Sequence, residues 1–245
     1  CLATGETILK IAAQEPHVQD LCLMLNNMGA NIEGVGTHTL RVKGVKKLKG
    51  VEHRVVPDYL EAGTFIVMGA LSEGRLVVND VVLEHLDHFL EKLKQMGIDF
   101  RKDTNSVEVF ESRNIRPAKV QALPYPGFPT DLLPLVVPVL TQAGGKSLIH
   151  DPLYENRLQY TQELRKMSAD IEIVDPHRAF VFGPTLLRGV TIESWDIRAG
   201  ASLILAGLMA EGKTTIKNVE QIDRGYERIE ERLAGLGANI KRISS

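Results

Sequence analysis

Cysteine, excess basic charge and long apolar runs are all scarce in this sequence. Cys1 and Cys22 are the two cysteines, and they form neither a disulfide framework nor a C-x-x-C pair, which is typical of a reducing compartment. The net charge of −2 argues against a nucleic-acid partner. The longest apolar runs, such as 201–210, are about ten residues, too short to cross a bilayer, and no signal-peptide pattern is present. These absences predict a soluble cytoplasmic protein with no membrane partner.

Metal ligands in a recognisable pattern are missing as well. The seven histidines are scattered, and none combines metal-ligand spacing with a nearby thiol, so we expect no metal ion. The 245 residues are enough for a sizeable core, in one large domain or two small ones.

What the sequence does contain is an internal repeat. A leucine, a hydrophobic residue and a small residue recur before an extended segment, and a separate glycine recurs before a β-rich segment. The leucine pattern lies in 25–32, 93–100, 164–171 and 233–240. The separate glycine is Gly5, Gly74, Gly145 or Gly212. Two independent marks share one period of about seventy residues, which chance does not readily produce.

Each repeat contains the same predicted elements. An apolar helix comes first, and a glycine, a short strand and an amphipathic helix follow. The apolar helices are expected in 63–71, 132–140 and 200–210. The amphipathic helix ends in a glycine suited to a left-handed C-terminal cap, and Ser168 replaces that glycine in one repeat. A strand pair such as 171–183 closes the repeat.

Helices that are apolar all round must be buried on every side, whereas the amphipathic helices need one buried face. We therefore predict an α/β fold of repeated units of about seventy residues. The expected architecture is an inside-out α/β barrel, in which sheets and amphipathic helices surround buried apolar helices. Both ends of the chain fall inside a repeat, so we expect this chain to be part of a longer protein. If the chain stood alone, its unpaired sheet edge would be prone to pairing with other chains.

A proline-rich loop leads to one carboxylate. The prolines of 124–129 fix their own φ angles and restrict the residues before them, and Asp131 follows. Asp58, Asp131 and Asp196 all precede the apolar helices, where aspartate is a favourable N-cap. One interpretation is therefore a stiff loop ending in a helix cap. The other is a carboxylate held at the entrance of a site, and the two are compatible.

Three arginines are predicted at places that a helix disfavours. Arg157, Arg198 and Arg224 fall in the first turn of their expected helices, where a cation opposes the helix dipole. A salt bridge to a neighbouring acid would explain one of them, but three equivalent places suggest a shared purpose. Helix N-termini offer free N–H groups, and arginine adds a bidentate fork for phosphate or carboxylate. The pattern therefore predicts a convergent anion site near Asp131 and Asp196.

Four strings carry a resemblance to a known family. They are LPYPGFPTD (123–131), LYENR (153–157), WDIRAGASLILAGLMAEG (195–212) and IDRGYERIEERLAGLGANI (222–240). In these strings, and along all 245 residues, the sequence resembles the enolpyruvyl transferases. Members that use UDP-N-acetylglucosamine, in the first committed step of peptidoglycan synthesis, match better than those that make 5-enolpyruvylshikimate 3-phosphate. The resemblance implies two domains of three such repeats, with the active site in the cleft between them.

The resemblance also implies a transfer reaction that needs no cofactor. Phosphoenolpyruvate is protonated at its methylene carbon, the sugar 3-hydroxyl attacks the neighbouring carbon, and phosphate leaves the adduct. Asp131 matches an aspartate proposed to take the hydroxyl proton, and Asp196 matches a second catalytic aspartate. Arg198 and Arg224 match arginines that hold the carboxylate and phosphate of phosphoenolpyruvate.

Further positions match the binding site for the nucleotide sugar. Leu153 matches a position that contacts the nucleotide through its backbone, so another apolar residue should serve there. Glu155, Asn156 and Arg157 match residues that line the same cleft.

The sequence also departs from the family pattern. A lysine–asparagine pair, a loop with a cysteine or aspartate acid and one arginine that binds phosphoenolpyruvate are absent. The resemblance implies that residues 1–57 are the last, truncated repeat of the first domain and that residues 58–245 are the second domain. The N-terminal part of the family chain would then be a missing partner, and this chain alone would be inactive. Cys1 is not expected to supply the thiol, because its context resembles the end of a buried helix.

Two other classes of function stay open. A remnant that binds a UDP-sugar or another anion without chemistry would also lack the lysine and the acid loop. RNA 3′-phosphate cyclases use related repeats, but the near-neutral charge and the DRGYERI string (223–229) argue against a nucleic-acid partner.

Overall fold

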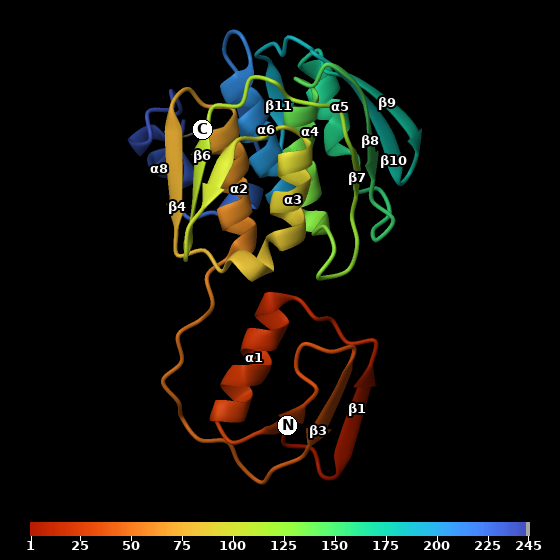
Figure 1. Cartoon of the computed structure of the whole chain (residues 1–245), viewed down its shortest axis with the longest axis vertical. Coiled ribbons are helices and arrows are strands. Elements are labelled where there is room, and N and C mark those ends of the chain that lie inside the picture. The colour runs from red at the N-terminus through yellow and green to blue at the C-terminus, as the bar shows by residue number, and fades with distance from the viewer. Residues whose placement is uncertain (244–245) are drawn as a thin grey trace. The chain divides into compact units, whose positions relative to one another are not determined.

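The computed structural model describes residues 1–243, which form two compact units (Figure 1). The first unit comprises Cys1–Asp58 and Pro124–Gly127, and the second comprises Tyr59–Leu123 together with the chain from Phe128 onward. Within residues 1–243, no helix combines the length and the apolar character needed to cross a membrane.

The first unit is one helix on a small antiparallel sheet. Its elements are β1 (Glu6–Lys10), α1 (Pro16–Asn27), β2 (Asn31–Glu33) and β3 (Thr39–Lys43), with the strands in the order β1-β3-β2. Cys22, Ile32 and Leu40 are its buried apolar side chains, and Cys1 packs against them from a stretch without helical structure. Cys1 thus packs as a small hydrophobe, as the sequence predicts.

The second unit is built around three helices that have no polar face. These helices are α2 (Tyr59–Ala70), α4 (Leu133–Leu140) and α6 (Ile197–Met209). All eight residues of α4 are buried, and α4 contacts both α2 and α6. Figure 1 shows the three helices at the centre of the unit, with sheets to either side. The predicted α/β fold with buried apolar helices is confirmed.

Sheets and amphipathic helices form the outer layer of the second unit. One sheet has the order β4-β6-β5, a second has the order β7-β8-β10-β9, and β11 pairs in parallel with β12. The strands are β4 (Arg75–Asn79), β5 (Phe100–Lys102), β6 (Ser106–Phe110), β7 (Lys119–Gln121), β8 (Gly145–His150), β9 (Asp170–Asp175), β10 (Arg178–Gly183), β11 (Thr191–Glu193) and β12 (Thr215–Lys217). The outer helices are α3 (Asp87–Gln95), α5 (Tyr160–Lys166), α7 (Glu220–Asp223) and α8 (Ile229–Gly235), with short 3-10 turns η1 (Leu83–His85) and η2 (Thr130–Leu132).

The same strand order recurs in three places along the chain. A strand, an amphipathic helix and two further strands follow one another, and the third strand always pairs between the first and the second. The triplets in sheet order are β1-β3-β2, β4-β6-β5 and β8-β10-β9. The repeat read from glycines and leucines is therefore a repeat of one supersecondary unit.

Buried hydroxyl groups within α2 and α6 and at the C-cap of α4 are satisfied by the helix backbone. Thr64 Oγ1 donates to the Leu60 carbonyl at 2.9 Å, Thr141 Oγ1 donates to Pro138 at 2.6 Å, and Ser202 Oγ donates to Ala199 at 2.7 Å. Because a buried hydroxyl without a partner is costly, these bonds let polar residues occupy the centre of the fold.

Ser168 occupies a backbone conformation that favours glycine. Its φ is 73°, in the place where Gly29, Gly97 and Gly237 have φ of 98°, 84° and 98°. The Ser168 side chain is exposed. We expect Ser168→Gly to raise the free energy of unfolding by about 0.5–1 kcal/mol, because it removes left-handed strain without losing packing. Urea denaturation followed by circular dichroism measures this change.

Gly237→Ser is the matched control for that substitution. A Cβ at Gly237 would meet no atom within 4 Å, so the variant tests backbone strain alone. It should destabilise the protein by a similar amount. If the two variants shift stability in the same direction, left-handed strain is not the cause.

Candidate active site

Asp131 lies at the end of the proline-rich loop, in η2 and directly before α4. The loop is closed by a hydrogen bond from the Leu123 N–H to the Phe128 carbonyl at 2.9 Å, and the Phe128 ring is fully buried. Leu132, not Asp131, occupies the N-cap position of α4, so the expectation that Asp131 caps this helix is wrong. The Asp131 side chain is 37% exposed and is therefore open to solvent.

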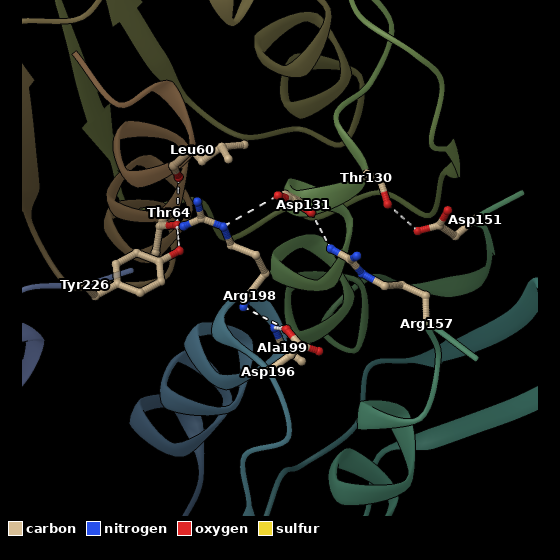
Figure 2. Close-up of polar contacts among 10 residues, drawn as sticks. All are labelled: Leu60, Thr64, Thr130, Asp131, Asp151, Arg157, Asp196, Arg198, Ala199 and Tyr226. Carbon is tan, nitrogen blue, oxygen red and sulfur yellow. Dashed lines mark hydrogen bonds and ion pairs between the residues drawn. The ribbon is translucent and has the colours of Figure 1, made fainter. Parts of the chain in front are cut away.

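Two guanidinium groups hold the Asp131 carboxylate from different parts of the chain (Figure 2). Arg157 Nη2 donates to Asp131 Oδ1, and Arg198 Nε lies 3.9 Å from Asp131 Oδ2. Arg157 is 22% exposed and Arg198 is 13% exposed, so both cations are largely withdrawn from water. Electrostatic attraction is stronger in such a place than at the surface, so this cluster is a candidate site for a further anion.

The Arg157 side chain has unused hydrogen-bonding capacity. Its Nε is buried and has no partner among residues 1–243. Its guanidinium also lies over the ring of Tyr154, with Cζ 5.0 Å from the ring centre, a cation–π contact that orients the planar group. A buried donor without a partner is costly, so a bound acceptor would lower the free energy of this site.

Asp196 begins α6 as the sequence predicts. Its Oδ1 accepts hydrogen bonds from the backbone N–H groups of Arg198 at 2.9 Å and Ala199 at 2.8 Å, which is an N-cap. The cap fixes the first turn of α6, and Arg198 extends from that turn toward Asp131 (Figure 2). The expected grouping of Asp196, Arg198 and Asp131 is therefore present.

The Arg198 guanidinium rests on a buried aromatic ring. Its Cζ lies 5.3 Å from the centre of the Tyr226 ring, and Tyr226 is fully buried. The Tyr226 hydroxyl is 2.7 Å from Thr64 Oγ1 in the middle of α2. Helices α2 and α6 and the turn between α7 and α8 are thus linked beside the Arg198 guanidinium.

Removing the Tyr226 hydroxyl tests this link. We expect Tyr226→Phe to lower the free energy of unfolding by about 1 kcal/mol, because one buried hydrogen bond is lost while Thr64 keeps its bond to Leu60. Chemical denaturation measures the loss. Tyr154→Phe is the control, since Tyr154 is 53% exposed and should change stability little. Equal stability of the two variants would mean that the Thr64–Tyr226 bond contributes nothing.

Asp151 joins two segments of the site and was missed from the sequence. Its side chain is fully buried, Thr130 Oγ1 donates to its Oδ2 at 2.6 Å, and the Leu153 N–H donates to its Oδ1 at 3.1 Å. It therefore ties the turn that carries Asp131 to the segment that carries Leu153 and Arg157. The available signal was an aspartate and a proline directly after an apolar strand, as in SLIHDP (147–152).

Tyr160 is a second residue that the sequence did not single out. Its hydroxyl is buried and has no hydrogen-bond partner within residues 1–243. Burial raises the pKa of this phenol, and the negative charges of Asp151 and Asp196 raise it further, while Arg157 opposes them. The group therefore stays protonated at any physiological pH and is a neutral donor close to the two aspartates.

The remaining predicted residues lie on the surface. Glu155, Asn156 and Arg224 are exposed, and Leu153 is 38% exposed. Arg224 Nη1 donates to Gln221 Oε1 at 3.2 Å, and no ion pair joins Arg224 to Asp131 among the described residues. The turn that carries Arg224 nevertheless approaches Arg198, because a Cβ at Gly225 would lie 3.7 Å from Arg198 Nη1.

The expected helical positions of two arginines are wrong. Arg157 lies three residues before α5, and Arg224 is the C-cap of the short helix α7 instead of the start of α8. Left-handed residues break the helices at both places, Asn156 with φ of 57° and Arg228 with φ of 44°. Only Arg198 is in the first turn of a helix, so the dipole argument applies to it alone.

The cluster contains donors for an anion and acceptors for a proton, but no metal ligand set. No group of three or more histidine, cysteine or acidic side chains with metal-binding geometry occurs within residues 1–243. The arrangement can bind a carboxylate or phosphate through Arg157 and Arg198. It can also accept a hydrogen bond from a substrate hydroxyl on the exposed side of Asp131.

Comparison with known proteins gives consistent results. The family model described as EPSP synthase (3-phosphoshikimate 1-carboxyvinyltransferase) matches residues 1–233. UDP-N-acetylglucosamine 1-carboxyvinyltransferase from Halothermothrix orenii is 45% identical over 241 residues, which cover 98% of this chain and 58% of that protein. The protein of the same name from Koribacter versatilis is 48% identical over 242 residues, which cover 99% of this chain and 56% of that protein.

A solved structure agrees with these relatives. The enolpyruvyl transferase NikO from Streptomyces tendae superposes with a TM-score of 0.91 at 27% identity, over 100% of this chain and 58% of that one. The chain therefore spans 56–58% of the length of the two curated relatives described above.

Proposed function

Because the chain belongs to the EPSP synthase (3-phosphoshikimate 1-carboxyvinyltransferase) family, we propose that the protein containing it transfers the enolpyruvyl group from phosphoenolpyruvate to the 3-hydroxyl of UDP-N-acetylglucosamine. Phosphate is the second product. The acceptor follows the names of relatives that are 45% and 48% identical. The observation that carries the proposal is the Asp131 carboxylate between Arg157 and Arg198. The carboxylate can accept a hydrogen bond from the sugar hydroxyl, and the two cations beside it can bind the anionic groups of phosphoenolpyruvate.

The proposed roles are those that the family resemblance implies, and the arrangement around Asp131 supports them in part. Asp131 accepts the proton of the sugar hydroxyl as oxygen attacks C2 of phosphoenolpyruvate, and its short turn holds it in place for that step. The methylene carbon is protonated to a methyl group, and the tetrahedral adduct then loses phosphate together with one proton of that methyl group, which forms the enol ether of the product. Arg198 and Arg224 hold the carboxylate and phosphate, and Asp196 assists proton movement.

The nucleotide sugar would lie along the segment after β8. Leu153 contacts the nucleotide through its backbone, which the Asp151 hydrogen bond orients at 3.1 Å. Glu155, Asn156 and Arg157 line the same cleft. We place residues 1–57 as the last repeat of a first domain and residues 58–245 as the second domain, with the remaining N-terminal part of the family chain completing the site.

An assay of the full-length protein tests the proposal. Phosphate release should require both phosphoenolpyruvate and UDP-N-acetylglucosamine, and shikimate 3-phosphate should not replace the sugar. Shikimate 3-phosphate is the second candidate acceptor, because the matching family model carries that enzyme's name. Binding of the UDP-sugar without release of phosphate from phosphoenolpyruvate with either acceptor would instead indicate a non-catalytic remnant.

A further inference from the structure

One arginine near the C-terminus binds two carboxylates. Arg242 Nη1 and Nη2 donate to Asp223 Oδ2 and Oδ1 at 2.8 and 2.5 Å. Its Nε and Nη2 donate to Glu230 Oε1 and Oε2 at 2.6 and 3.1 Å. A single guanidinium therefore engages both oxygens of each acid, a geometry that arginine provides and lysine does not.

Arg242 stabilises the charged form of both acids. Hydrogen bonds from Arg242 are the largest cause that lowers the pKa of Asp223 and the pKa of Glu230. Both acids are therefore ionised at neutral pH, and Arg242 is their shared cation. Without Arg242, the ionised Asp223 carboxylate would lose its cation and could pair with another one.

The cation closest in sequence to Asp223 is Arg224. Arg224 is exposed, and within residues 1–243 its guanidinium forms no ion pair, only a hydrogen bond to the neutral Gln221. Its turn packs on the start of α6, where a Cβ at Gly225 would lie 2.5 Å from Ile197 Cγ2. Arg224 thus lies on a turn near the anion site, and within residues 1–243 no carboxylate neutralises its charge.

We propose that Arg242 is a positioning residue for Arg224: by occupying both oxygens of Asp223, it prevents that acid from pairing with Arg224 and leaves the Arg224 guanidinium for the anionic substrate. The inference rests on the proposed function, because it takes Arg224 as a ligand of phosphoenolpyruvate. The inference adds Arg242, which lies outside the site, as a residue that keeps Arg224 free to bind the substrate.

Kinetics of the full-length protein test this inference. Arg242→Gln should raise KM for phosphoenolpyruvate about two- to fivefold, the range expected for one partly exposed competing charge, with kcat nearly unchanged. The double variant Asp223→Asn with Arg242→Gln should restore KM, because the competing charge is gone. A merely structural role for Arg242 would lower the free energy of unfolding and kcat in the single variant, without a selective rise in KM for phosphoenolpyruvate.

Arg113→Gln is the matched control. Arg113 also binds one carboxylate with two hydrogen bonds, to Glu111 at 2.8 and 3.0 Å, and its side chain is 79% exposed. KM for phosphoenolpyruvate should be unchanged in this variant. An unchanged KM in Arg242→Gln, or a double variant no better than the single one, would overturn the inference.

A binding measurement separates this inference from the proposed function. Inorganic phosphate is titrated into the wild-type protein and each variant, and its dissociation constant is obtained from the shift in melting temperature. If the wild type releases no phosphate with either acceptor, the proposed function fails. The positioning role still predicts weaker phosphate binding in Arg242→Gln and recovery in the double variant, and equal affinities would refute it.

Discussion

Asp131→Asn should lower kcat of the full-length protein by about 10²–10⁴-fold, the usual contribution of a general base. Asparagine preserves the shape of the side chain and can still accept a hydrogen bond, but it cannot take up a proton. Binding of UDP-N-acetylglucosamine should therefore weaken far less than turnover falls. Phosphate release at saturating substrates and calorimetric titration of the nucleotide sugar measure the two effects separately.

A second variant distinguishes loss of the proton acceptor from a disturbed turn around Asp131. The carboxylate is the partner of Arg157 and lies near Arg198, so a neutral residue leaves two cations facing each other. Leu132→Met, at the next position, is a volume-conserving control in the same turn. Near wild-type phosphate release by Asp131→Asn would remove Asp131 from the mechanism, whereas equal losses in both variants would indicate a disturbed turn.

Arg157→Lys should lower kcat/KM by about 30- to 900-fold, corresponding to roughly 2–4 kcal/mol for a largely buried charge pair. Lysine keeps the positive charge but loses the planar fork that meets Asp131 and lies over Tyr154. The loss should appear mainly as a higher KM for phosphoenolpyruvate if the buried Nε is a substrate donor. Arg113→Lys is the surface control and should be neutral.

A double variant shows how Arg157 acts. If Arg157 serves only to orient Asp131, Arg157→Lys should cause no further loss when Asp131→Asn is already present. If Arg157 also binds the substrate anion, the double variant should be weaker in phosphoenolpyruvate binding than either single variant. A wild-type kcat/KM in Arg157→Lys would contradict both roles.

The fold could be predicted because its signals are local and repeated. Apolar helices such as 132–140 have no polar face, and glycines at the same place in each repeat mark the helix ends. These features depend on nearest neighbours in the sequence, and the structure has the same strand order in three places. The cap at Asp196 was predictable for the same reason, since its side chain accepts from the backbone N–H groups two and three residues on.

The site was predictable only in part, because its contacts are long-range. The pairing of Asp131 with Arg157 joins residues from different segments, and the sequence indicated a shared anion site without showing which arginine lies closest. Tyr226 acts through burial and through a partner far along the chain, which no local pattern reveals. Asp151 is marked locally only by its place after an apolar strand, which does not show that it binds Thr130. The helix starts assigned to Arg157 and Arg224 failed because Asn156 and Arg228 adopt left-handed conformations that the sequence does not mark.

The most direct test of the central claim is a crystal structure of the full-length protein with UDP-N-acetylglucosamine and a non-reactive analogue of phosphoenolpyruvate. The distance to measure joins the sugar 3-hydroxyl oxygen and the nearer Asp131 carboxylate oxygen. We expect about 2.6–3.2 Å, the reach of a general base, with the analogue's anionic groups on Arg198 and Arg224. A hydroxyl beyond hydrogen-bond distance, with Asp131 still paired only with Arg157 and Arg198, would contradict the claim.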